Sequence, residues 1–245
     1  MADRIVLNIP HSSFQFPFGY DAWDNGIHID MERLTDIFTD KLFIPDTSQP
    51  EIIPVIFPYS RFFCDAERLV DDPMEKIGQG IIYRRFNGKS RMVSVADEER
   101  IMEFYWNYQR CLCEAIRDEN SFVVDCHSFP SDISDVDICI GLNDDWSRPD
   151  DKLVDDIITV FNRYGYTTAI NTPFSNSITP ECSFRYKSLM IEVNKKRYLS
   201  DDDLLDESKM IRIKSAILDV YSAIFAYKRA PSCILWISYN QNSSA

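Results

Sequence analysis

Two histidines stand where strands of a predicted sheet should end. His11 follows the apolar run at residues 4–9 and Pro10, and His127 closely follows a second apolar run at residues 121–124. In open α/β sheets, ligands bind where the carboxyl ends of the strands converge. If these two strands are parallel neighbours, both imidazoles emerge at one edge of the sheet, which suggests a metal site. In hydrolases, zinc commonly takes three His or carboxylate ligands and a water molecule.

The third ligand of such a site is expected among nearby acids. Residues 30–43 carry apolar side chains at helical spacing, which predicts one helix with Asp36 and Asp40 four positions apart on one face. Asp36 is the preferred zinc ligand, and Asp40, one turn further on, is the alternative or a support for a ligand. Asp125 is expected to support a histidine or its own loop. The competing interpretation is that both histidines are hydrogen-bonded structural residues.

An acid interrupts the apolar run at residues 188–193. Glu192 is costly to bury there unless it is paired, so its presence needs a reason. In a zinc hydrolase, a glutamate beside the metal takes a proton from the bound water and returns it to the leaving amine. The alternative is that Glu192 faces solvent or pairs with Lys195, Lys196 or Arg197, and without a metal this alternative is preferred.

Five arginines between residues 61 and 91 are concentrated in an acidic chain. Arg61 and Arg85 are the two that we expect to bind a substrate carboxylate through bidentate hydrogen bonds, although for any single arginine a surface or structural ion pair is the preferred interpretation. The sequence contains neither a Walker loop nor GxGxxG, and it lacks a GxSxG-type nucleophile elbow. Without these motifs, the histidines and acids are the main candidates for catalytic residues.

Composition restricts the possible partners. The chain has 245 residues, a formal net charge of −13 and a pI of about 4.6, so its average surface repels nucleic acid and anionic lipid. No run approaches the roughly twenty apolar residues of a membrane span. The seven cysteines are odd in number and form no CxxC pair, and the N-terminus does not resemble a signal peptide. We therefore expect reduced thiols, a cytoplasmic location, and neither nucleic acid nor membrane as a partner.

Strands and helices are expected to alternate along most of the chain. The expected strands are residues 4–9, 51–57, 121–124, 136–141, 166–171, 188–193 and 233–237, and the expected helices are residues 30–43, 94–118, 147–164 and 200–227. This order predicts an α/β fold, a three-layer α/β/α sandwich with a mostly parallel mixed sheet. Residues 1–240 are expected to form one domain, and residues 241–245 a flexible tail.

Several segments together resemble the N-formylglutamate amidohydrolase family. They span the chain from end to end and stand in the order of that family. The segments are IPHSS at 9–13, TDIFTDKLF at 35–43, SRFFCDAER at 60–68, GIIYRR at 80–85, VVDCHS at 123–128, DICIG at 137–141, NTPF at 171–174 and MIEVNKKRYL at 190–199.

The resemblance implies a phosphorylase/hydrolase-like fold, shared with zinc carboxypeptidases and N-acetylmuramoyl-L-alanine amidases. By motif position it implies Zn²⁺ bound by His11, Asp36 and His127, with Glu192 as the catalytic base, which is the set reached above from the residues alone. The implied reaction is hydrolysis of the N-formyl or a similar N-acyl amide of an acidic amino acid. N-formylglutamate would give formate and glutamate, a step of histidine degradation.

The implied substrate is a small anionic N-acyl amino acid, held by Arg61 or Arg85 together with Asn171. Two segments depart from the family. FSNSIT follows Pro173 where the family usually has a glycine-rich turn, and Glu67 replaces the asparagine of a DxNR motif. The alternatives are a zinc carboxypeptidase or cell-wall amidase, and a non-catalytic binding protein with the same fold.

Overall fold

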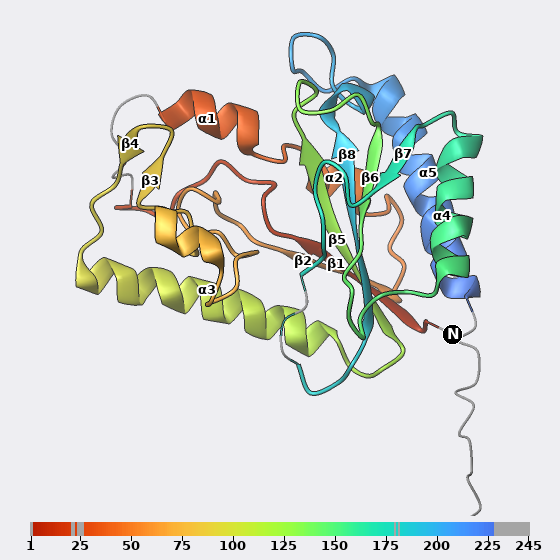
Figure 1. The fold of residues 1–245 in the computed structure, drawn as a ribbon, viewed down its shortest axis with the longest axis horizontal. Helices are drawn as coiled ribbons and strands as arrows, with labels where there is room; N and C mark the ends of the chain where they lie inside the picture. Colours follow the sequence, from red (N-terminus) through yellow and green to blue (C-terminus); the bar gives the residue numbers. More distant parts are fainter. Residues whose placement is uncertain (1, 21–22, 24–26, 179, 181, 228–245) are drawn as a thin grey trace, which may run out of the picture.

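The computed structural model describes residues 2–20, 23, 27–178, 180 and 182–227. A six-stranded sheet crosses this part of the chain in the order β2-β1-β5-β8-β6-β7 (Figure 1). All neighbouring strands are parallel except β6 and β8, which are antiparallel. The strands are β1 (Arg4–Ile9), β2 (Ile52–Ile56), β5 (Ser121–Phe129), β6 (Ile138–Gly141), β7 (Thr168–Ile170) and β8 (Lys187–Asn194). The predicted α/β fold with a mostly parallel mixed sheet is confirmed.

Helices cover both faces of the sheet, so the three-layer prediction is also confirmed (Figure 1). The helices are α1 (Ile27–Leu34), α2 (Thr39–Phe43), α3 (Val95–Ala115), α4 (Asp151–Arg163) and α5 (Glu207–Ala226). Alternate residues of β1 point to opposite sides: Ile5 and Leu7 join the core formed with α2, α4 and α5, whereas Val6 joins the core formed with α3. A strand apolar on both faces is therefore buried on both.

Local signals in the sequence explain several element ends. The side chain of Ser94 accepts a hydrogen bond from Asp97 N and caps α3. Gly165 has φ +81° just after α4, the left-handed conformation that glycine adopts without strain. Pro54 lies on β2, an edge strand, as expected. The last helix starts later than predicted, because Asp206, and not Ser200, caps it by accepting from Ser208 N and Lys209 N.

The single helix predicted for residues 30–43 is wrong. The chain forms α1 and α2 with a turn at residues 35–38 between them. Asp36 N donates to His11 O at 2.9 Å, outside any helical pattern, and Phe38 adopts a left-handed φ of 65°. A backbone donor taken by His11 O, two residues beyond β1, and a residue in the left-handed region interrupt the helix. Asp36 and Asp40 consequently do not share a helical face.

The stretch after residue 72 is short and irregular. It contains the 3-10 helix η1 (Pro73–Ile77) and a hairpin of β3 (Arg85–Phe86) and β4 (Lys89–Ser90). A second 3-10 helix, η2 (Lys195–Arg197), follows β8 directly.

The predicted strand at residues 233–237 and the predicted tail at residues 241–245 lie outside the described residues. Among the described helices, none combines the length and apolar character needed to cross a membrane.

Two cysteines form a disulfide, which corrects the expectation that all thiols are reduced. Cys113 on α3 bonds to Cys182 in the loop before β8, with Cα atoms 5.4 Å apart and 69 positions between them in the chain. A pairing at that separation leaves no local spacing pattern. Among the described residues, the free thiols are Cys64, Cys111, Cys126 and Cys139.

Candidate active site

Three central strands bring His11, His127 and Glu192 to one edge of the sheet. His127 on β5 is in register with Glu192 on β8, and β1, which leads to His11, pairs with β5 on its other side. Both histidines are buried, and their ring centroids lie 5.2 Å apart. The expectation that the two imidazoles emerge together at the carboxyl ends of parallel strands is confirmed.

A carboxylate holds the Nε2 atom of each imidazole. Asp65 Oδ1 lies 2.8 Å from His11 Nε2, and Asp125 Oδ1 lies 3.0 Å from His127 Nε2. Asp125 itself accepts from Asn8 Nδ2 at 2.6 Å and from Ile178 N at 2.8 Å, so the histidine that it supports is fixed in turn. Carboxylates in this position orient imidazoles whose other nitrogen binds a metal. The supporting role expected for Asp125 is therefore seen, and Asp65 is an unforeseen counterpart.

The Nδ1 atoms of both imidazoles face Asp36. Asp36 Oδ2 is 3.0 Å from His127 Nδ1 and 3.7 Å from His11 Nδ1. His11 Nδ1 is buried and has no hydrogen-bond partner among the described residues. A buried polar atom of this kind is costly unless a further group satisfies it. Two nitrogens and a carboxylate oxygen at such separations fit the donor set of a catalytic metal.

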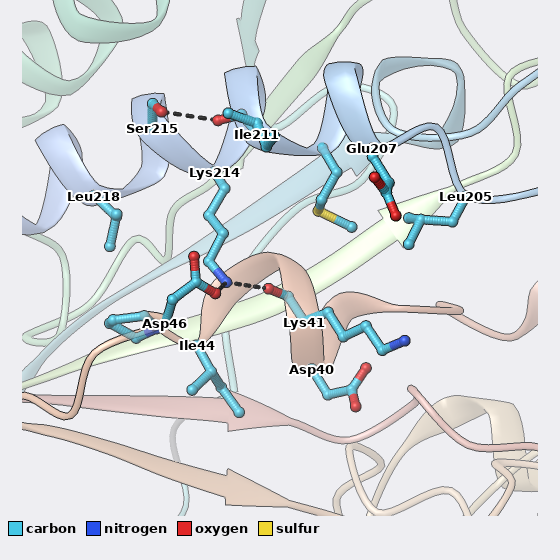
Figure 2. A pocket seen from close by; sticks show the side chains of 12 residues that line it. Asp40, Lys41, Ile44, Asp46, Leu205, Glu207, Ile211, Lys214, Ser215 and Leu218 are labelled. Carbon is cyan, nitrogen blue, oxygen red and sulfur yellow. Dashed lines mark hydrogen bonds and ion pairs between the residues drawn. The ribbon is translucent and has the colours of Figure 1, made fainter.

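Asp40 lines hollows other than the pocket that contains His127. It lies on α2 and lines a hollow of about 500 Å³ between α2 and α5, whose lining also includes Ile44 and Leu218 (Figure 2). It is absent from the lining of the pocket that contains His127. Of the two acids considered from the sequence, the structure brings only Asp36 to the imidazoles.

Glu67 is a further carboxylate beside the two imidazoles. Its Oε1 lies 3.2 Å from His127 Nε2, and its Oε2 lies 3.7 Å from His11 Nδ1. Ligand atoms of His11, Glu67 and His127 all lie within 4.8 Å of one another, so this largely buried group could bind a metal ion. Sequence reasoning did not assign Glu67 to the metal site. The available signal was its replacement of an asparagine in a DxNR motif.

The acids around the imidazoles favour bound positive charge. Burial lowers the pKa of His127, but the carboxylates of Glu67 and Asp125 outweigh burial and raise that pKa well above its usual value. Burial raises the pKa of Asp36, but the adjacent imidazoles of His11 and His127 outweigh burial and lower that pKa below its usual value. Without a metal the cluster holds protons on its imidazoles; a cation of higher charge would replace them.

Glu192 faces the same pocket and carries an unsatisfied oxygen. Its side chain is buried, and Oε2 has no hydrogen-bond partner within the described part of the chain. Burial raises the pKa of Glu192 to about 8, and the charges of Asp36 and Glu67 add to the shift. A carboxyl group with a pKa near neutrality is suited to accept and release a proton.

The basic residues after Glu192 have other partners. Lys195 Nζ donates to two backbone carbonyls before Asp36, Lys196 Nζ donates to Asp135 O, and Arg197 pairs with Asp137. The three described cations are thus bound to other groups, which argues against the alternative that Glu192 pairs with one of them. Glu192 stays available for chemistry in the pocket.

The pocket has a volume of about 510 Å³ and is lined by both polar and apolar side chains. Asp36, Glu67, His127 and Glu192 supply acid and imidazole groups, and side chains that include Phe129, Phe174 and Met190 line it as well. Arg61 is the arginine of the expected pair that reaches it. Its guanidinium donates to Asp65 Oδ2 at 2.9 Å and to Tyr83 OH at 3.3 Å, so its position is fixed.

Two expected substrate-binding residues lie elsewhere. Arg85 is exposed on the β3–β4 hairpin and does not line the pocket. The Asn171 side chain accepts from Leu142 N at 2.7 Å and donates to Leu142 O at 3.1 Å, which pins the turn after β7 to the end of β6. Asn171 also has a φ of 53°, a conformation that asparagine tolerates better than most residues. The structure brings neither side chain to the metal-binding group.

Comparison with known proteins agrees with this geometry. Residues 3–199 match the model of the family described as N-formylglutamate amidohydrolase. The fold is similar to that of N-formylglutamate amidohydrolase from Ralstonia eutropha JMP134, with 21% identity and a TM-score of 0.72 over 92% of this chain and 95% of that one. It is also similar to the gene product Atu2144 of Agrobacterium tumefaciens, with 16% identity and a TM-score of 0.66 over 91% and 92%. No curated protein sequence matches the chain. The family match covers most of the chain, which therefore belongs to the N-formylglutamate amidohydrolase family.

Proposed function

We propose that this protein is a zinc-dependent amidohydrolase that cleaves the amide bond of a small anionic N-acyl amino acid. The observation that carries the proposal is the arrangement at the sheet edge. The buried His11 Nδ1 lacks a partner, Asp36 Oδ2 lies near both Nδ1 atoms, and Glu192 opens into the same pocket. Family membership supports hydrolysis of an amide independently of this geometry.

His11, Asp36 and His127 would hold the zinc ion, with the first and last through Nδ1. Bound zinc would polarise the amide carbonyl and acidify a water molecule. Asp65 and Asp125 would keep both imidazoles in the tautomer that carries hydrogen on Nε2 and leaves Nδ1 free to bind. Glu67 lies close enough to act as a further donor, and two imidazoles with a carboxylate are a ligand set that zinc takes in hydrolases.

Glu192 would act as general base and then as general acid. Its unpaired Oε2 would accept a proton from the attacking water and deliver it to the nitrogen of the departing amine. The raised pKa of Glu192, about 8, supports protonation and deprotonation near neutral pH. Burial in the pocket also keeps bulk water from competing for this proton.

Arg61 would bind a carboxylate of the substrate. It lines the pocket, and Asp65 and Tyr83 hold its guanidinium in place, so it would meet the substrate without reorganising. Arg85 and Asn171 lie outside the pocket lining, and Asn171 would contribute only by fixing the turn at Leu142. Because the chain belongs to this family, N-formylglutamate is the first substrate to test. Its hydrolysis would yield formate and glutamate.

Purified protein should contain about one zinc ion per chain after reconstitution and should release formate from N-formylglutamate. Glu192→Gln should retain the metal and lose at least about 100-fold in kcat, because the proton acceptor is gone. Glu119→Gln, at an exposed glutamate, is the matched control and should behave as the wild type. If the protein binds stoichiometric zinc but releases no formate, the formyl substrate is rejected and the proposed metal site still stands. Failure to bind zinc after reconstitution would reject the proposal.

A further inference from the structure

A buried lysine connects the strand of the catalytic glutamate to the turn of the aspartate. Lys195 Nζ donates to Arg33 O at 2.6 Å and to Thr35 O at 2.7 Å, bonds that span 162 and 160 positions of the chain. The residue as a whole is 6% exposed. Lys195 follows the last residue of β8 and stands three positions after Glu192, while Thr35 directly precedes Asp36.

These two carbonyls belong to the end of α1. The last carbonyls of a helix have no partner within it, and the helix dipole places partial negative charge there. Helix α1 ends at Leu34. The ammonium group of Lys195 donates to Arg33 O and Thr35 O, so it supplies both a hydrogen-bond donor for these carbonyls and a positive charge near the negative end of the helix dipole. Burying a lysine is unfavourable in itself, and burial lowers the pKa of Lys195. The unfavourable burial of Lys195 indicates that its contact with the turn at residues 33–35 is needed to hold that turn in position.

The turn after α1 is fixed from a second direction by β1. Asp36 N donates to His11 O at 2.9 Å, and Asp36 O accepts from Thr39 N and Thr39 Oγ1. The backbone around Asp36 is therefore tied to the strand of His11 on one side and, through Lys195, to the strand of Glu192 on the other. Loss of one tie would leave the carboxylate of Asp36 free to shift with its turn.

We propose that Lys195 is a positioning residue that holds the Asp36 turn against β8 and so sets the geometry between the metal-binding carboxylate and Glu192. Lys195 acts through the backbone at residues 33–35 and does not contact the pocket, whose lining does not include it. This inference rests on the proposed function, because it assigns Asp36 to the metal.

The neighbouring lysine provides a matched control. Lys196 is in the same short helix, but its Nζ is partly exposed and donates to Asp135 O, on the loop before β6. Lys195→Met and Lys196→Met remove the same charge and the same donors one position apart. Only the first removes a contact with the Asp36 turn. Lys195→Arg keeps a cation with several donors and serves as the conservative variant.

The zinc dissociation constant, measured by competition with a chromophoric chelator, is the principal readout. Changes behind a metal ligand typically cost 10- to 100-fold in metal affinity, so we expect Lys195→Met to raise the constant by about that factor. The zinc dissociation constant of Lys196→Met should stay within about twofold of the wild-type value. The constant of Lys195→Arg should lie between those of Lys196→Met and Lys195→Met. With formyl substrate, Lys195→Met should lower kcat more than it raises KM.

A double-mutant cycle separates positioning from general destabilisation. Asp36→Asn keeps one side-chain oxygen and should leave a weakened zinc affinity that competition can still measure; in this background Lys195→Met should cause little further loss, because its effect passes through Asp36. Equal zinc affinity in Lys195→Met and Lys196→Met would overturn the inference, as would full additivity in the cycle. If the wild-type protein itself fails to bind zinc, the proposed function fails and the two failures are distinguished.

Discussion

Asp36 Oδ2 lies 3.0 Å from His127 Nδ1, although the two residues are 91 positions apart in the chain. The same oxygen is 3.7 Å from His11 Nδ1. One buried carboxylate thus faces the inward nitrogens of both imidazoles, and the proposal that Asp36 is a metal ligand rests on this relationship.

The first prediction compares the two acids considered from the sequence. Asp36→Ala should abolish stoichiometric zinc binding, because it removes an oxygen that faces both Nδ1 atoms. Asp40→Ala should retain zinc, because Asp40 lines the hollow between α2 and α5. Metal content after dialysis against a weak chelator, measured by atomic emission, checks both. Retention of zinc by Asp36→Ala would show that Glu67 supplies the third ligand instead.

The strands and their histidines could be predicted because the relevant signals are local. Apolar runs end in polar residues at His11 and His127, and parallel pairing of β1 with β5 brings such ends together. Glu192 could be singled out for a similar reason, since a lone acid in a buried strand needs a function or a partner.

The turn that carries Asp36 could not be predicted from helical spacing. The apolar positions of residues 30–43 fit one helix, but the break depends on His11 O and on Lys195 Nζ, which lie far away in the sequence. The roles of Asp65 and Glu67 depend in the same way on where the loop after β2 folds back. Contacts between distant segments leave no period in the sequence.

A second prediction concerns the charge that Glu67 places beside the imidazoles. In the metal-free protein the carboxylates of Glu67 and Asp125 outweigh burial and raise the pKa of His127 well above 6.5. Glu67→Gln should lower that pKa, because it removes the charge of Glu67 and leaves the charge and the hydrogen bond of Asp125. Titration of the His127 ring protons by NMR in both proteins measures the change. An unchanged His127 pKa would mean that Glu67 turns away from the imidazole in solution.

The third prediction follows from the pKa of Glu192, which burial raises from 4.5 to about 8 in the metal-free protein. Between these values the folded state binds more protons than the unfolded state, so the free energy of unfolding falls as pH rises. The contribution of protonated Glu192 to the free energy of unfolding is fully present below about pH 4.5. It decreases as the pH rises and is lost once the pH has passed about 8. The slope from this one group is at most about 1.4 kcal/mol per pH unit.

Glu192→Gln removes this dependence, since an amide does not ionise. The metal-free variant should match the wild type near pH 5 and be more stable than the wild type near pH 8. Urea denaturation of both proteins at the two pH values gives the comparison. A variant less stable than the wild type at pH 8 would contradict a buried, unpaired carboxylate at this position.

The fourth prediction concerns the disulfide between Cys113 and Cys182, which closes a loop of 69 positions. By loop-closure entropy a bridge of this span stabilises the folded state by about 4 kcal/mol, and measured values commonly lie near 2–4 kcal/mol. Replacing both cysteines by serine should lower the free energy of unfolding by that amount, as measured by denaturation with guanidinium chloride.

Cys111 is the matched control for this change. It is an exposed free thiol on α3, two positions before Cys113, so Cys111→Ser should alter the free energy of unfolding by less than about 0.5 kcal/mol. Reduction with dithiothreitol should reproduce the effect of the double variant in the wild type and have little effect on the double variant itself. If reduction leaves the wild-type stability unchanged, the bridge does not stabilise the link between α3 and the loop before β8.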